Sequence, residues 1–238
     1  MMLHVLYPFL TMALLELQLV AVSTFRAMGI KMVQPDSPPH KLYYVAADII
    51  KATVLAGLMA STVFWKAAVA AVWYDDWTTH EHMIRVMAIA YCATDAAQFL
   101  TVKMQRTTLA HHVCTTLFGL YIALDGPFTP VCKAMLWYGL CSVVAYLVNA
   151  YKALRVVVDP SHRRMEVLRV CAKYMYALEL VINWPVHVML TVYAFVDSTS
   201  AVQTALAALY LVVTSVFVVD DLKLYRFLAT KPANTNPH

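Results

Sequence analysis

Three ionisable side chains within apolar stretches are the clearest candidates for chemistry in this sequence. Asp95 lies shortly before the basic segment 103–106, and His111 and His112 lie shortly after it. If the two stretches are antiparallel helices with a rise of about 1.5 Å per residue, the carboxylate and the imidazoles lie at a similar depth, roughly 8 Å from the helix ends. Adjacent histidines diverge by about 100° on a helix, so we expect only one of them to point into the bundle centre.

Two interpretations of this set stay open. An aspartate can accept the N–H of an imidazole, fix its tautomer and raise its basicity, so that Asp95 with His111 or His112 could serve general-base or nucleophilic catalysis. The same three residues could equally form a buried polar clamp between two helices, without chemistry. Spacing alone does not separate the clamp from a catalytic site.

A second polar set lies further along the chain. Glu179, Asn183 and His187 follow one another at intervals of four residues, which places them on one face of a helix. A carboxyl group inside an apolar span is costly, so Glu179 should face the bundle interior. The stripe could recognise a lipid head group, relay protons or line the path of a transporter or receptor. It could also be a ladder of hydrogen bonds between helices.

No metal site or cofactor motif accompanies these residues. His80, Glu81 and His82 lack the i, i+4 histidine spacing of a helical zinc site and a third ligand nearby. The sequence also contains no phosphate-binding glycine loop and no nucleophile elbow. We therefore expect no bound metal and no resident cofactor.

The composition indicates the elements that must position these side chains. Hydrophobic residues make up 61% of the 238 residues and charged residues only 13%, whereas soluble domains carry about 45–50% and about 25%. The net charge of +4 comes mostly from short connections between apolar stretches, a pattern of membrane topology and not of nucleic-acid binding. The sequence thus predicts an integral membrane protein.

Apolar stretches of bilayer-spanning length recur along the whole chain. We expect an all-α, polytopic membrane bundle of about seven helices, because a crossing needs about 20 residues. The bundle should form a single transmembrane domain over residues 1–230, followed by a mobile polar tail, 231–238. The predicted spans are 3–25, 43–73, 83–100, 107–124, 131–153, 167–195 and 201–219.

The connections between these spans alternate in charge. Basic residues follow the odd-numbered spans, at Arg26, Lys31, Lys41, Lys103, Arg106, Arg155, Arg163, Arg164, Lys223, Arg226 and Lys231. Acidic residues without lysine or arginine follow the even-numbered spans, at Asp75, Asp76, Glu81, Asp125 and Asp197. Because basic connections stay in the cytosol, we expect a lumenal or exterior N-terminus and a cytosolic C-terminus.

The first polar set carries a resemblance to a known family. Residues 91–95, Tyr-Cys-Ala-Thr-Asp, and residues 109–116, Leu-Ala-His-His-Val-Cys-Thr-Thr, resemble the core of the TLC-domain family, the multi-span lipid proteins that include ceramide synthases. The resemblance implies a TLC-like core over about residues 43–224, arranged around a lipid-accepting cavity. The resemblance to the ceramide synthases of this family implies transfer of an acyl chain from acyl-CoA to a sphingoid amine.

One family motif is absent. Ceramide synthases follow the paired histidines with a second acidic motif, His-Asp-x-x-Asp-x-x-x-Glu-x-x-Lys. When the lysine of this motif is aligned with Lys152, its other four named positions correspond to Cys141, Ser142, Ala145 and Asn149. Ser142 and Asn149 are smaller polar substitutes, and their spacing of seven places them on one helix face.

Three functional hypotheses follow. The first is a lipid-handling protein that binds acyl lipid within the bundle and influences membrane lipid or sphingolipid composition. The second is an acyl-CoA-dependent N-acyltransferase that uses His111 or His112, with acyl-CoA as co-substrate. The third is a transporter or receptor. We expect membrane lipids as partners and the endoplasmic reticulum or another endomembrane as location. The sequence leaves open whether the protein is an enzyme and whether it forms oligomers.

Overall fold

The described part of the chain consists of helices joined by short connections. The computed structural model describes residues 2–30, 40–123, 128–159 and 161–230, and every regular element within these ranges is an α-helix, as predicted. The helices are α1 (Met2–Ala27), α2 (His40–Ala60), α3 (Thr62–Trp73), α4 (Glu81–Thr101), α5 (Arg106–Ala123), α6 (Pro130–Ser142), α7 (Ala145–Val157), α8 (Arg163–Val196) and α9 (Ala201–Ala229).

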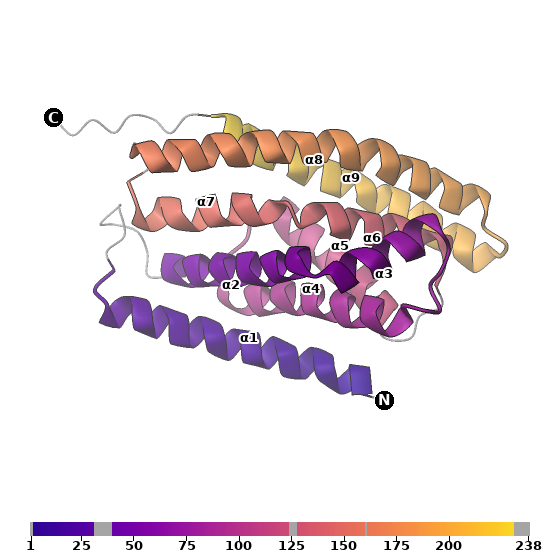
Figure 1. Cartoon of the computed structure of the whole chain (residues 1–238), viewed down its shortest axis with the longest axis horizontal. Coiled ribbons are helices and arrows are strands. Elements are labelled where there is room, and N and C mark those ends of the chain that lie inside the picture. Colours follow the sequence, from indigo (N-terminus) through magenta and orange to yellow (C-terminus); the bar gives the residue numbers. More distant parts are fainter. Residues whose placement is uncertain (1, 31–39, 124–127, 160, 231–238) are drawn as a thin grey trace.

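The helices lie side by side in one bundle (Figure 1). Helix α1 runs along one edge and packs against α2 and α4, whereas α8 and α9 pack together along the opposite edge. Between these edges, α2 packs against α7, α6 against α8, and α5 contacts both α4 and α9. Helix α5, which carries the paired histidines, therefore bridges the two halves of the bundle.

The structure supports membrane spans but does not confirm the predicted number of seven. Within the described residues, four helices, α1, α4, α8 and α9, are long and apolar enough to cross a membrane. The number rises to six if each of the bent pairs α2/α3 and α6/α7 forms one span. The predicted span 107–124 coincides with α5, which is not among these candidates. Helix α5 has 18 residues, and the polar side chains of Arg106, His111 and His112 lower its mean hydropathy.

Two predicted spans are not continuous helices. The span 43–73 is divided into α2 and α3, which meet at a bend of 73°. Ser61 lies at the break, where its hydroxyl accepts a hydrogen bond from the Phe64 N–H and caps α3. The span 131–153 is divided into α6 and α7, bent by 46°, and Ser142 donates its hydroxyl to the Gly139 carbonyl there. Serine hydroxyls that bond the local backbone favour such interruptions.

The distribution of apolar side chains fits helices that face hydrocarbon. Large apolar residues such as Val5, Val181 and Val212 are exposed on α1, α8 and α9, while Asp95 and Asn183 are fully buried. An outward apolar surface and a partly polar interior are expected where the surroundings are lipid.

The basic connections meet at one end of the bundle. Lys41, Lys103, Arg155 and Lys223, which come from four different connections or helix ends, line a single cavity. That this end faces the cytosol stays a prediction. Asp125 and the tail 231–238 lie outside the described residues.

Helices α4 and α5 approach each other closely at Gly119. A Cβ added to Gly119 would lie 2.2 Å from Cys92 Sγ, and that thiol also contacts the Thr116 carbonyl at 3.7 Å. A side chain at position 119 would therefore force Cys92 to move or separate the two helices.

Gly119→Ala is expected to destabilise the protein by about 1–3 kcal/mol, the usual cost of overpacking a core. In a Cys92→Ala background the cost should largely disappear, because the added Cβ would then face Cβ of residue 92 at 4.0 Å. Gly139→Ala is the control, since a Cβ there meets no atom within 4 Å. Unfolding of the purified protein in detergent measures these differences. An equal loss in both backgrounds would contradict the proposed contact.

Candidate functional site

A polar cavity of about 620 Å³ opens at the end of the bundle where the basic connections meet. Its wall includes the connection between α4 and α5, where Lys103 and Gln105 are exposed, so the cavity reaches the surface there. Among the described residues, six basic side chains line it, Lys41, Lys51, Lys103, Lys152, Arg155 and Lys223. Four acidic side chains of the described residues line it as well, Asp48, Glu179, Asp220 and Asp221.

Asp95 lies beside the cavity at the centre of a buried ion cluster. Its Oδ1 lies 2.6 Å from Lys51 Nζ, and its Oδ2 lies 3.0 Å from His112 Nδ1. Thr115 donates its hydroxyl to the same Oδ2 at 3.3 Å. The structure thus brings together Asp95 and one of the paired histidines, as their matching depth suggested. Lys51 is an additional member of the site, because no sequence motif links it to Asp95.

His111 makes a different set of contacts. Its Nδ1 lies 3.1 Å from Asp220 Oδ2, and its Nε2 lies 3.3 Å from the Tyr138 hydroxyl. Thr108 donates to Asp220 Oδ1 at 2.9 Å. An Nδ1–H donated to Asp220 leaves Nε2 with a free lone pair, the form of imidazole that can act as a base.

The hydroxyl of Tyr138 has a second partner. It lies 3.4 Å from Asp221 Oδ1, which also accepts the Tyr176 hydroxyl at 2.8 Å. Tyr138 has one proton, which it can donate to His111 Nε2 or to Asp221 Oδ1. Both contacts are hydrogen bonds at the same time only when His111 carries a proton on Nε2 and donates it to the Tyr138 oxygen. The network can therefore hold a proton in more than one place.

Both paired histidines line the cavity, and they contact different helices. Their ring centroids are 5.4 Å apart. His111 packs against Phe217 of α9 and His112 lies near Phe99 of α4. The α5 residues that line the cavity are Thr108, His111 and His112, whose spacing of i, i+3 and i+4 places them on one side of the helix.

Ser142 and Asn149 also line the cavity. The prediction that they share one helix face is wrong, because α6 ends at Ser142 and α7 begins at Ala145. The 46° bend between these helices nevertheless directs both residues to the same space. Ser142 lies 3.2 Å from the Tyr91 hydroxyl.

The predicted stripe on α8 is divided. Glu179 lines the cavity, and its Oε2 is buried without a hydrogen-bond partner among the described residues. Asn183 and His187 do not line it. His187 is fully buried between the rings of Trp184 and Tyr210, at centroid distances of 5.1 and 5.6 Å. The ring nitrogens of His187 and the side-chain amide of Asn183 have no hydrogen-bond partner among the described residues, as is also true of Glu179 Oε2. Of the three residues, only Glu179 lines the cavity.

Sequence reasoning missed several residues of this site. No sequence motif singles out Asp220 and Asp221, yet they contact His111, Tyr138 and Tyr176. Lys152 was noted only as the surviving lysine of the family motif, and it lies 3.9 Å from Asp48. A signal was present in the position of these residues along the chain, since each lies at or next to the basic end of its predicted span.

Within the described ranges, no group of three histidine, cysteine, aspartate or glutamate side chains is arranged to hold a metal ion. Comparison of the chain with protein-family models, curated proteins and solved structures finds no match. Membership of the TLC-domain family accordingly stays a prediction from residues 91–116.

Proposed function

We propose that this protein binds a membrane lipid, with the lipid head group in the polar cavity, and that it influences membrane lipid composition through this binding. The observation that carries the proposal is a charged cavity of about 620 Å³ between helices whose outer surfaces are apolar. Its volume falls within the range of small-molecule sites, about 300–1,000 Å³.

The charges of the cavity suit an amphiphile with a polar head. The basic residues Lys41, Lys103 and Arg155 come from the helix ends and connections, whereas Glu179 and Asp221 lie deeper. A head group with hydrogen-bond donors or an amine would satisfy the buried Oε2 of Glu179. The transporter hypothesis has less support, because Asn183 and His187 do not extend the cavity along α8.

The experiment compares lipid binding by two glutamate variants on α8. Wild-type protein purified in mild detergent should retain lipid that native mass spectrometry detects. Glu179→Gln should bind it about two- to tenfold more weakly, as expected from the loss of one hydrogen bond to a buried carboxyl group. Glu166→Gln is the matched control, because Glu166 pairs with Arg169 outside the cavity. No retained or added lipid on the wild-type protein would overturn the proposal.

A second candidate function, acyl transfer from an acyl-CoA to an amine, is favoured by the contacts of His111. With Nδ1–H donated to Asp220, His111 Nε2 can take a proton from the amine as its nitrogen attacks the thioester carbonyl. The C–N bond forms, the C–S bond breaks, and the coenzyme A thiolate takes the proton back from His111. Lys103 and Arg155 would face the phosphates of the coenzyme at the basic end.

A further inference from the structure

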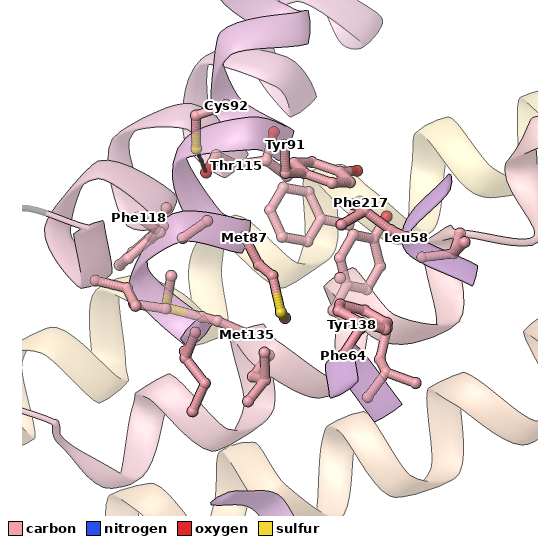
Figure 2. A pocket seen from close by; sticks show the side chains of 18 of the residues that line it. Leu58, Phe64, Met87, Tyr91, Cys92, Thr115, Phe118, Met135, Tyr138 and Phe217 are labelled. Carbon is pink, nitrogen blue, oxygen red and sulfur yellow. Dashed lines mark hydrogen bonds between the residues drawn. The ribbon is translucent and has the colours of Figure 1, made fainter. Parts of the chain in front are cut away.

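A second, apolar cavity adjoins the polar one deeper in the bundle. Its volume is about 90 Å³, and its lining side chains come mainly from α4, α5, α6 and α9, with Leu58 and Phe64 from α2 and α3 (Figure 2). Tyr91 and Tyr138 line both cavities. Their hydroxyls face the polar groups, since Tyr91 bonds Ser142 and Tyr138 contacts His111. The two tyrosines therefore mark the boundary between polar and apolar space.

We infer that this apolar cavity holds the end of the hydrocarbon chain of the bound lipid, and that Gly139 determines how much of the chain fits. The inference rests on the proposed function, because it assigns the tail of the same ligand. A lipid whose head lies beside His111 would extend its chain between Tyr91 and Tyr138 into this space.

The chemistry of the cavity suits a hydrocarbon. Apolar cavities of this kind stay dry and accept apolar ligands, and an engineered cavity of about 150 Å³ accepts benzene. The present cavity is smaller, so it has room for only the last few carbons of a chain. Met87 projects into it and Met135 lies on its wall (Figure 2). Unbranched thioether side chains of this kind adapt readily to ligands of different shape.

Gly139 leaves part of this space free. It follows Met135 by four residues and Leu136 by three on α6, and all three line the cavity, so they share one helix face. A Cβ added to Gly139 would meet no atom within 4 Å. A methyl group at this position therefore has free space, and we expect a larger side chain to extend into the cavity.

The test measures chain-length preference in the full chain. Wild type, Gly139→Ala and Gly139→Leu are incubated with lysophosphatidylcholines that differ only in chain length, and binding is measured by native mass spectrometry. Gly139→Leu should shift the preference to shorter chains, with affinity for long chains falling about fourfold for each methylene that loses its apolar site. Gly139→Ala should show a smaller shift in the same direction.

Gly57→Leu is the matched control. Gly57 is also helical, a Cβ there also meets no atom within 4 Å, and the residue does not line the cavity, so its chain-length profile should equal that of wild type. Lipid binding by Gly139→Leu with the wild-type ratio of chain lengths would overturn this inference alone. Binding of no lipid by any of the proteins would overturn the proposed function as well.

Met135→Ala, which enlarges the cavity, should shift the preference to longer chains, and an unchanged profile would count against the inference.

Discussion

Asp95→Ala is expected to lower the free energy of unfolding by about 3–5 kcal/mol, the cost of leaving a buried charge without its partner. Asp95 is fully buried, and its Oδ1 lies 2.6 Å from Lys51 Nζ. Lys51 is itself buried, so loss of the carboxylate would leave its ammonium group without its ion-pair partner. Equilibrium unfolding of the purified protein in detergent measures the loss.

Two further variants identify the cause. The double variant Lys51→Met with Asp95→Leu should recover most of the stability, because it removes both charges and leaves apolar side chains of suitable size. Asp75→Asn is the control for an ordinary ion pair. Asp75 pairs with Lys133 at 2.9 Å, but its side chain is 67% exposed, so the change should stay below about 1 kcal/mol. A double variant as unstable as Asp95→Ala would show that the charge pair is not the source of the effect.

His111→Ala is expected to lower the rate of acyl transfer by about a hundred- to ten-thousand-fold, the usual contribution of a general base, if the second candidate function holds. His111 is the only described histidine that contacts both Asp220 and the Tyr138 hydroxyl. The assay incubates the purified protein with a long-chain acyl-CoA and a sphingoid amine and measures the amide product.

The control variant for this assay is His82→Ala. His82 is exposed near the start of α4 and does not line the polar cavity, so the variant should retain the wild-type rate. An unchanged rate in His111→Ala would remove His111 as the base. Absence of product from the wild-type protein would remove the acyltransferase candidate and leave the lipid-binding proposal in place.

The sequence predicted the elements of the site better than their contacts. Depth from the basic end of each span correctly placed Asp95 beside a histidine, because rise per residue is nearly constant in helices. The same reasoning did not identify Lys51 or Asp220 as members of the site. The position of a residue along a helix gives its depth, but it does not show which neighbouring helix the side chain contacts. Which helices pack together is decided by side-chain shapes, as at Gly119, where α4 and α5 come close.

The sequence by itself determined that this is an all-helical chain with membrane-spanning segments, because low charge and long apolar stretches leave few other structures available. Tertiary structure decided where the segments break and which side chains meet. The serines Ser61 and Ser142 lie at two breaks that hydropathy did not reveal, because local hydrogen bonds to the backbone do not alter hydropathy. Packing of α5 against both α4 and α9 then assembled one polar cavity from residues more than a hundred positions apart, such as His111 and Asp220.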